Sequence, residues 1–277
     1  MSSKNTNANY AVALGNFDGV HIGHQQVIKT TKQKAAELGC KSAVITFSPH
    51  PAHILSTQPF HEILSSDEKI KIIKDLGIDE VIIINFDQKF AEMPAESFIN
   101  DICQKWNIKS ITTGYNFRFG YNRQGDINTI NKLKNRYNFK YNAINQVLHN
   151  GCEISSSILR KVIKTGCIRL FSDFTNRYYT INCTLHNKVH DLYIFDRVYN
   201  QLLLPPDGVY LGETDGNYVC LFLNKSQLTV KPIDCEIESE NKIKLIQILG
   251  QEISIDNLLT NSVEIESYMK KAKFCLI

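Results

Sequence analysis

The chain has 277 residues, of which 43% are hydrophobic and 21% are charged, so it can bury a sizeable core in one large or two modest domains. Its net charge of +3 is small, and its lysines are mixed with acids, which argues against binding to nucleic acid. No apolar run reaches the roughly 18 residues that span a bilayer, and the polar opening 1–9 lacks the apolar stretch of a secretory signal. We therefore expect a cytoplasmic protein whose partners include neither nucleic acid nor a membrane.

From about residue 10 to 147, apolar β-branched runs alternate with helical patterns, which predicts βαβ units around a parallel, doubly wound sheet. Ser66 is the expected N-cap of the second helix, and Gly77 and Gly166 lie just past the ends of two helices. The expected strands are 10–14, 42–47, 80–84, 110–113 and 140–147, and the expected helices are 24–38, 66–76, 95–106 and 155–164.

Beyond Phe171 the pattern changes to short alternating runs broken by turn residues, which predicts a small antiparallel β domain. We therefore expect an α/β protein with one domain over 1–168 and a second over 169–277. The runs are 178–185, 192–198, 208–212 and 218–223, followed by an expected strand at 245–249 and a closing helix at 263–271.

The 8 cysteines are scattered, without a Cys-x-x-Cys pair or histidines at zinc-ligand spacing. We expect buried thiols in a reducing compartment and no metal held by protein ligands. The cysteines are Cys40, Cys103, Cys152, Cys167, Cys183, Cys220, Cys235 and Cys275.

The first expected strand runs directly into a glycine-containing turn, and a helix is expected to begin at His24. Such a turn presents backbone N–H groups and the positive end of the helix dipole to an anion, so phosphate is the expected ligand. Gly23 would let the backbone approach closely, and His21 and His24, one helical turn apart, can donate to the same phosphate. A single histidine here would more often be a cap, but the pair favours phosphate chemistry. The turn consists of Gly15, Asn16, Phe17, Asp18 and Gly19.

The fourth expected strand is followed by a loop with arginines for phosphate, aromatic faces for a flat ring, and glycines for close approach. Ligands of doubly wound sheets bind where the strand order reverses, and the loops after the first and fourth strands can flank that point. A solvated arginine loop is the alternative. The candidate ligands of this loop are Gly114, Asn116, Phe117, Arg118, Arg123 and Asp126.

Two shorter segments complete the candidate site. Ser155, Ser156 and Ser157 stand at a predicted helix start, and with Arg160 one turn later they would form an anion site for the β- and γ-phosphates of ATP. Plain helix capping is an equally good explanation of these serines. The loop Pro49, His50 and Pro51 ends the second strand and would frame the entry of a substrate, although alone it is an ordinary exit from a strand.

Together, the segments between about residues 10 and 165 resemble the prokaryotic FAD synthetase family, whose usual form joins an FMN adenylyltransferase domain to a riboflavin kinase domain. Asn116 stands where the family usually has Asp, which predicts altered affinity rather than lost chemistry. The resemblance rests on Gly-Asn-Phe-Asp-Gly-Val-His-x-Gly-His, Thr-Phe-x-Pro-His-Pro, Phe-Asp with a following Phe, Gly-x-x-Phe-Arg-Phe-Gly-x-x-Arg-x-Gly-Asp, and Ile-Ser-Ser-Ser-x-x-Arg.

The resemblance implies a Rossmann-like nucleotidyltransferase domain in which the FMN phosphate attacks the α-phosphorus of ATP, delivered with Mg²⁺, to give FAD and pyrophosphate. His21 and His24 would contact the ATP phosphates, and the turn 15–19 the nucleotide. The serines 155–157 with Arg160 would hold the pyrophosphate, while 116–126 and the 49–51 loop would line the FMN side.

The second half resembles the family less closely. The segment 204–210 is similar to the family's Pro-x-x-Gly-Val-Tyr element, which implies a small kinase-type β barrel. The Pro-Thr-Ala-Asn motif expected before it is absent, and its nearest counterpart is Arg197, Val198, Tyr199 and Asn200. We therefore expect a degenerate kinase domain that no longer phosphorylates riboflavin.

Several alternatives stay open. Two alternatives apply if the expectations above fail. The chain would then be a working bifunctional enzyme, or a nucleotidyltransferase for another acceptor such as nicotinamide mononucleotide or phosphopantetheine. A fragment of a class I aminoacyl-tRNA synthetase lacks support, because there is no Lys-Met-Ser-Lys-Ser loop. A flavin-binding regulator without catalysis would not require His21, His24 and Arg160 together.

Overall fold

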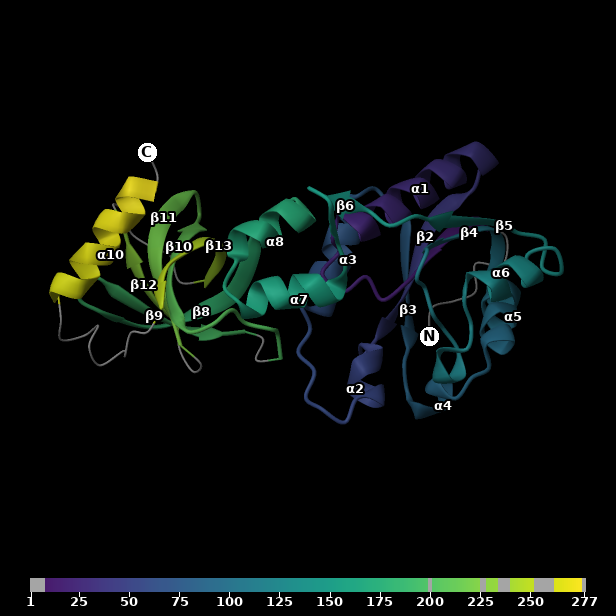
Figure 1. Ribbon diagram of the computed structural model, residues 1–277, viewed down its shortest axis with the longest axis horizontal. Coiled ribbons are helices and arrows are strands. Elements are labelled where there is room, and N and C mark those ends of the chain that lie inside the picture. Colours follow the sequence, from purple (N-terminus) through teal and green to yellow (C-terminus); the bar gives the residue numbers. More distant parts are fainter. Residues whose placement is uncertain (1–7, 199–200, 225–227, 234–239, 252–261, 276–277) are drawn as a thin grey trace. The chain divides into compact units, whose positions relative to one another are not determined.

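The computed structural model describes residues 8–198, 201–224, 228–233, 240–251 and 262–275 (Figure 1). The chain divides into two units, Met1–Ser156 and Ser157–Ile277, whereas the sequence pattern placed the boundary after residue 168. Within the described ranges, no helix is both long and apolar enough to cross a membrane.

The first unit contains a parallel sheet of five strands in the order β3-β2-β1-β4-β5. Because β1 pairs with both β2 and β4, the order reverses between β1 and β4, as a doubly wound sheet requires. The expected α/β fold is confirmed. The strands are β1 (Asn9–Leu14), β2 (Lys41–Ser48), β3 (Glu80–Asn85), β4 (Asn107–Gly114) and β5 (Lys140–Ile144).

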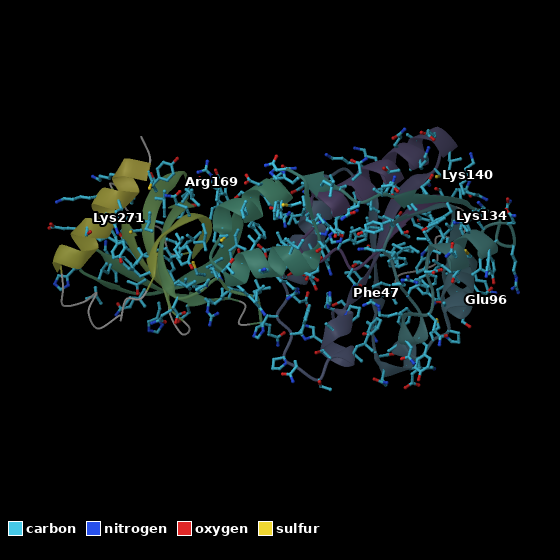
Figure 2. All side chains as sticks on the ribbon, viewed as in Figure 1. Phe47, Glu96, Lys134, Lys140, Arg169 and Lys271 are labelled. Atoms are coloured by element: carbon cyan, nitrogen blue, oxygen red, sulfur yellow. The ribbon has the colours of Figure 1, made fainter. Side chains whose placement is uncertain are left out.

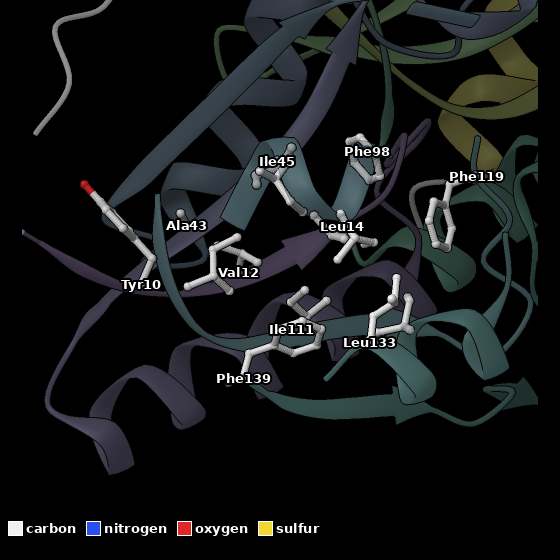
Figure 3. Packing of buried hydrophobic residues seen from close by; sticks show 14 of the residues in the cluster. Tyr10, Val12, Leu14, Ala43, Ile45, Phe98, Ile111, Phe119, Leu133 and Phe139 are labelled. Carbon is white, nitrogen blue, oxygen red and sulfur yellow. The ribbon is translucent and has the colours of Figure 1, made fainter. Parts of the chain in front are cut away.

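Helices cover both faces of this sheet, which explains why its strands are almost continuously apolar. Ala13 and Val44 pack on one face against α1 (Ile22–Leu38) and α3 (Ser66–Asp75). Val12 and Leu14 pack on the other face against α5 (Ala95–Lys105) and α6 (Ile127–Leu133), in the cluster shown in Figure 3. Figure 2 shows charged side chains such as Glu96 and Lys140 at the rim of this unit and Phe47 inside it.

Several boundaries differ from those expected. The fifth strand ends at Ile144 rather than at 147, because the chain turns there into a hairpin formed by β6 (Leu148–His149) and β7 (Cys152–Glu153). The N-cap of α3 is Ser65, not Ser66, because Ser65 has an extended backbone and its side chain accepts a hydrogen bond from the Glu68 N–H. The hairpin strands β6 and β7 were not predicted, and neither were four short helical elements, namely α2 (Pro51–Leu55), α4 (Gln88–Ala91), a 3₁₀ turn (Tyr121–Arg123) and α6.

The second unit holds a closed antiparallel barrel in the order β10-β11-β12-β9-β8-β13, which confirms the expected barrel-like domain. Its helix α10 packs on the barrel, where Ala272 joins Leu211 and Ile233 (Figure 1). The elements are α7 (Ser156–Lys164), α8 (Ile168–Thr175), β8 (Tyr179–Val189), β9 (Leu192–Arg197), β10 (Gly208–Thr214), β11 (Asn217–Leu223), β12 (Leu228–Pro232), β13 (Glu240–Gln251) and α10 (Ser262–Cys275).

The expectation that the cysteines are buried is largely wrong. Among the seven cysteines that the structure describes, only Cys183 and Cys220 are buried, and both lie on inward-facing positions of barrel strands. Cys152, Cys167 and Cys275 are exposed because they lie at a hairpin, a helix start and a helix end. Cys40 and Cys103 are half-buried, and Cys235 lies outside the described residues.

Candidate active site

The turn after β1 has an unusual backbone that the protein interior holds in place. Phe17, Gly19 and Val20 all have positive φ, and the Val20 N–H closes the turn by donating to the Phe17 carbonyl at 3.1 Å. Positive φ is costly for a β-branched residue such as Val20 and is often found at functional sites. Phe17 is 1% exposed and packs in the α1 and α3 layer, and the Asp18 carboxylate accepts from the Ile63 N–H at 3.1 Å. Phe17 and Asp18 therefore shape the turn from inside, while Gly15 and Asn16 stay partly exposed.

The two histidines lie together at the start of α1. The helix begins at Ile22, two residues before the expected start, because His21 acts as its N-cap. The His21 Nδ1 accepts from the His24 backbone N–H at 3.3 Å, and the two rings stack with centroids 3.7 Å apart. Since Nδ1 accepts, a neutral His21 carries its proton on Nε2 and can donate it to an anion.

Gly23 has a clear steric role in this arrangement. A Cβ atom on Gly23 would lie 3.1 Å from the His21 ring, so the glycine makes room for the capping imidazole. Sequence reasoning assigned this glycine to the close approach of phosphate. His24 also meets the edge of Phe17, with ring centroids 5.3 Å apart, so both imidazole rings are fixed by neighbours.

The loop after β4 folds back on itself through a backbone bridge between Phe119 and Gly125. Gly120 has φ +72°, and a Cβ there would lie 2.6 Å from the backbone of Ala95 at the start of α5. A Cβ on Gly125 would lie 2.7 Å from the Ala95 Cβ. These glycines therefore pack the loop against the protein's own helix, which corrects the expectation that they make room for a ligand.

The side chains of this loop divide into packed and exposed groups. Phe117 stacks on Phe119, which belongs to the core, so these aromatic faces are used largely within the protein. Asp126 caps α6, and the Thr129 backbone N–H holds the pKa of its carboxyl below the usual range. Arg118 contacts Asp126 at 3.0 Å, and both Arg118 and Arg123 are exposed.

Two residues that sequence reasoning did not select connect the loop to the neighbouring hairpin. The Tyr115 hydroxyl donates to the Glu153 carboxylate at 2.6 Å, which raises the pKa of Tyr115. Asn116 follows it and is exposed, while the Gly114 carbonyl accepts from the Phe117 N–H at 3.1 Å. Nothing in the local pattern of the sequence marks a contact between positions so far apart.

The loop of Pro49, His50 and Pro51 leads directly into a helix. Pro51 occupies the first turn of α2, where its fixed φ suits a helix start, and His50 is the N-cap, accepting from the Ala52 N–H at 3.1 Å. The His50 ring stacks on Phe60 with centroids 4.4 Å apart. Pro49 is exposed.

The serine segment is joined to the turn after β1 by a hydrogen bond. The Ser156 hydroxyl donates to the Asp18 carbonyl at 2.9 Å, at the point where α7 begins. Ser155 is half-buried. Ser157 and Arg160 belong to the second unit, Ser157 exposed and Arg160 half-buried on α7.

The reversal of strand order between β1 and β4, together with a histidine pair at a helix start after β1, defines a nucleotide-binding α/β enzyme. Residues 3–158 match the family model of FAD synthetase. The chain belongs to the FAD synthetase family, which makes it an enzyme of the nucleotidyltransferase class.

Three curated relatives are named as bifunctional riboflavin kinase/FMN adenylyltransferases. The one from Buchnera aphidicola of Acyrthosiphon pisum is 30% identical over 96% of this chain and 86% of its own length. The one from Buchnera of Schizaphis graminum is 35% identical over 65% of this chain, a match that spans 58% of that relative. The Bacillus subtilis protein is 30% identical over 77% of this chain and 70% of its own length.

A solved structure shares the fold. The crystal structure of a macrolide-efflux protein from Streptococcus pneumoniae matches with a TM-score of 0.83 over 96% of this chain and 95% of that chain. Its sequence identity is 20%, so the likeness concerns the fold alone.

Proposed function

We propose that the chain transfers AMP from ATP to FMN, forming FAD and releasing pyrophosphate. An oxygen of the FMN phosphate attacks the α-phosphorus of ATP, and the bond to the β-phosphate breaks so that its electron pair leaves with pyrophosphate. This reaction needs no nucleophilic side chain, because positioning and charge stabilisation supply the catalysis. The observation that carries the proposal is the stacked pair His21 and His24 at the start of α1, in a chain that belongs to the FAD synthetase family.

In this proposal each chemical task of adenylyl transfer is assigned to particular residues. The His21 Nε2 and His24 donate to the ATP phosphates at the start of α1, where the helix dipole favours an anion. Arg160 and the serines 155–157 bind the departing pyrophosphate. Magnesium enters with ATP, because Mg²⁺ is usually held through substrate phosphates and water.

The FMN side is assigned to the loop 114–126 and to Pro49, His50 and Pro51. Arg118 and Arg123 are supported as phosphate ligands by their exposure, and Gly114 and Asn116 by their place at the end of β4. Phe117 and Asp126 support the loop from inside, through the stacking on Phe119 and the cap of α6. The proposal includes a cytoplasmic location, where ATP and reduced thiols coexist.

We further propose that the second unit no longer phosphorylates riboflavin. Val198, which follows β9 and is 51% exposed, offers a methyl group where a hydroxyl ligand of Mg²⁺ is needed. Tyr199 and Asn200, the other candidates at this motif, lie outside the described residues. A closed barrel can persist after its activity is lost. The names of the relatives favour the alternative, a bifunctional enzyme.

Chromatography of flavins after incubation with Mg-ATP tests both statements. With FMN we expect FAD, and with riboflavin alone we expect neither FMN nor FAD. Nicotinamide mononucleotide and phosphopantetheine serve as control acceptors. Adenylylation of either control in preference to FMN would replace the proposed acceptor, and steady formation of FMN from riboflavin would show that the kinase is intact.

A further inference from the structure

The hairpin of β6 and β7 leads directly into the serine segment 155–157 of the candidate active site. Its strands pair Leu148 with Glu153 and His149 with Cys152. The Ile154 N–H donates to the Val147 carbonyl at 3.3 Å and closes the stem. The position of this stem therefore decides where the serine segment lies.

The stem and the segment after it also contact the parts of the site that follow β1. A Cβ on Gly23 would lie 3.9 Å from the Val147 Cβ, so the stem packs beside the first turn of α1. The Ser156 hydroxyl donates to the Asp18 carbonyl at 2.9 Å. A movement of the hairpin would therefore displace the serine segment relative to the turn after β1 and the start of α1.

Side chains attach this hairpin to the loop after β4. The Tyr115 hydroxyl donates to the Glu153 carboxylate at 2.6 Å, a length typical of a charge-assisted hydrogen bond. The Tyr115 backbone N–H donates to the Ile144 carbonyl at 2.8 Å, which fixes the tyrosine to the end of β5. The hydrogen bond to Glu153 raises the pKa of Tyr115, so its hydroxyl stays protonated and remains a donor. Tyr115 therefore joins the loop after β4 to the last residue of β7.

We propose that Tyr115 and Glu153 are a positioning pair for adenylyl transfer, whose hydrogen bond fixes the hairpin and so aligns the loop after β4 with the serine segment. This inference rests on the proposed function, which assigns that loop to FMN and the serines to pyrophosphate. In-line attack requires the attacking phosphate and the departing pyrophosphate to be aligned. Neither side chain contacts a substrate in this proposal. Loss of the pair should therefore lower kcat and leave KM for FMN and for Mg-ATP nearly unchanged.

The test compares initial rates and melting temperatures of Tyr115→Phe, Glu153→Ala and Glu153→Gln in the full chain. Tyr115→Phe removes one hydroxyl from a side chain that is 39% exposed, so the variant should fold like the wild type. We expect Tyr115→Phe and Glu153→Ala each to lower kcat for FAD about 10-fold, as the loss of one hydrogen bond to a charged group would. Glu153→Gln keeps an acceptor oxygen and should recover part of kcat. Tyr218→Phe changes another exposed tyrosine, on β11, and should match the wild type.

Two further measurements separate positioning from direct contact with a substrate. Hydrogen exchange of residues 145–154, which needs no activity, should be faster in Tyr115→Phe than in the wild type, with α5 unchanged. The double variant of Tyr115→Phe with Glu153→Ala should lose about as much kcat as one single variant, because both changes remove the same bond.

Several results would overturn the positioning role. They are multiplied losses in the double variant, unchanged exchange of the hairpin, wild-type kcat in a single variant, a change confined to KM, and unfolding of both single variants. The activity of the wild type on FMN and Mg-ATP is measured first, because its absence would be a failure of the proposed function instead.

Discussion

Replacement of His21 separates two roles that one imidazole combines. Its Nδ1 caps α1 by accepting from the His24 N–H at 3.3 Å, and an N-cap side chain contributes about 1 kcal/mol to stability. Its Nε2 is the proposed donor to phosphate, and loss of one preorganised donor costs roughly 3 kcal/mol, or on the order of 100-fold in rate. His21→Ala should therefore lower the melting temperature by about 2 to 4 °C and the rate of FAD formation on the order of 100-fold.

His21→Asn is the matched control, because asparagine is a strong N-cap but its amide does not extend as far as Nε2 of an imidazole. It should restore the melting temperature and leave the rate low. His24→Ala, which keeps the backbone N–H of the cap, should lose a similar factor in rate. Initial rates by flavin chromatography and thermal unfolding give both quantities. The reasoning is wrong if His21→Asn restores the rate, or if either alanine variant keeps more than half of the wild-type rate.

Arg160→Ala should mainly raise KM for Mg-ATP, with partial recovery in Arg160→Lys; weaker FMN binding with unchanged ATP kinetics would reverse the assigned sides. Gly120→Ala should destabilise the protein by more than Gly39→Ala in urea unfolding, because both positions have positive φ but only Gly120 meets the Ala95 backbone at 2.6 Å, and equal losses would contradict this packing. Burial raises the pKa of Cys183 and Cys220 to about 12 each, so both thiols should resist maleimide in the folded chain while exposed Cys152 and Cys167 are labelled, and rapid labelling of Cys220 in the folded chain would contradict the barrel packing.

Periodic patterns in the sequence were sufficient for the main architecture. The apolar runs of β1 and β2 and the longer helices α1 and α5 repeat over enough residues to reveal their type. The spacing of His21 and His24 also predicted that their imidazole rings lie close together, and the stacked rings confirm this. The short helices α2 and α4 span four or five residues, too few for a helical period to emerge.

The remaining features depend on contacts between distant positions. The close approach of Ala95 explains why positions 120 and 125 are glycines, but no local sequence pattern connects Ala95 with Gly120 or Gly125. Lys69 lies in a polar helical segment, and its burial follows from the packing of α3 near the turn after β1. The choice between Ser65 and Ser66 as N-cap is likewise decided by backbone dihedral angles that adjacent serines do not reveal.

The transfer of a labelled phosphorus tests the central claim most directly. The purified chain would be incubated with FMN, Mg²⁺ and ATP labelled at either the α- or the γ-phosphorus, and the flavins and pyrophosphate would then be separated. Adenylyl transfer predicts that the α-label appears in FAD and the γ-label in pyrophosphate, in equal amounts. A γ-label in the flavin, or an α-label that enters no flavin, would contradict the account.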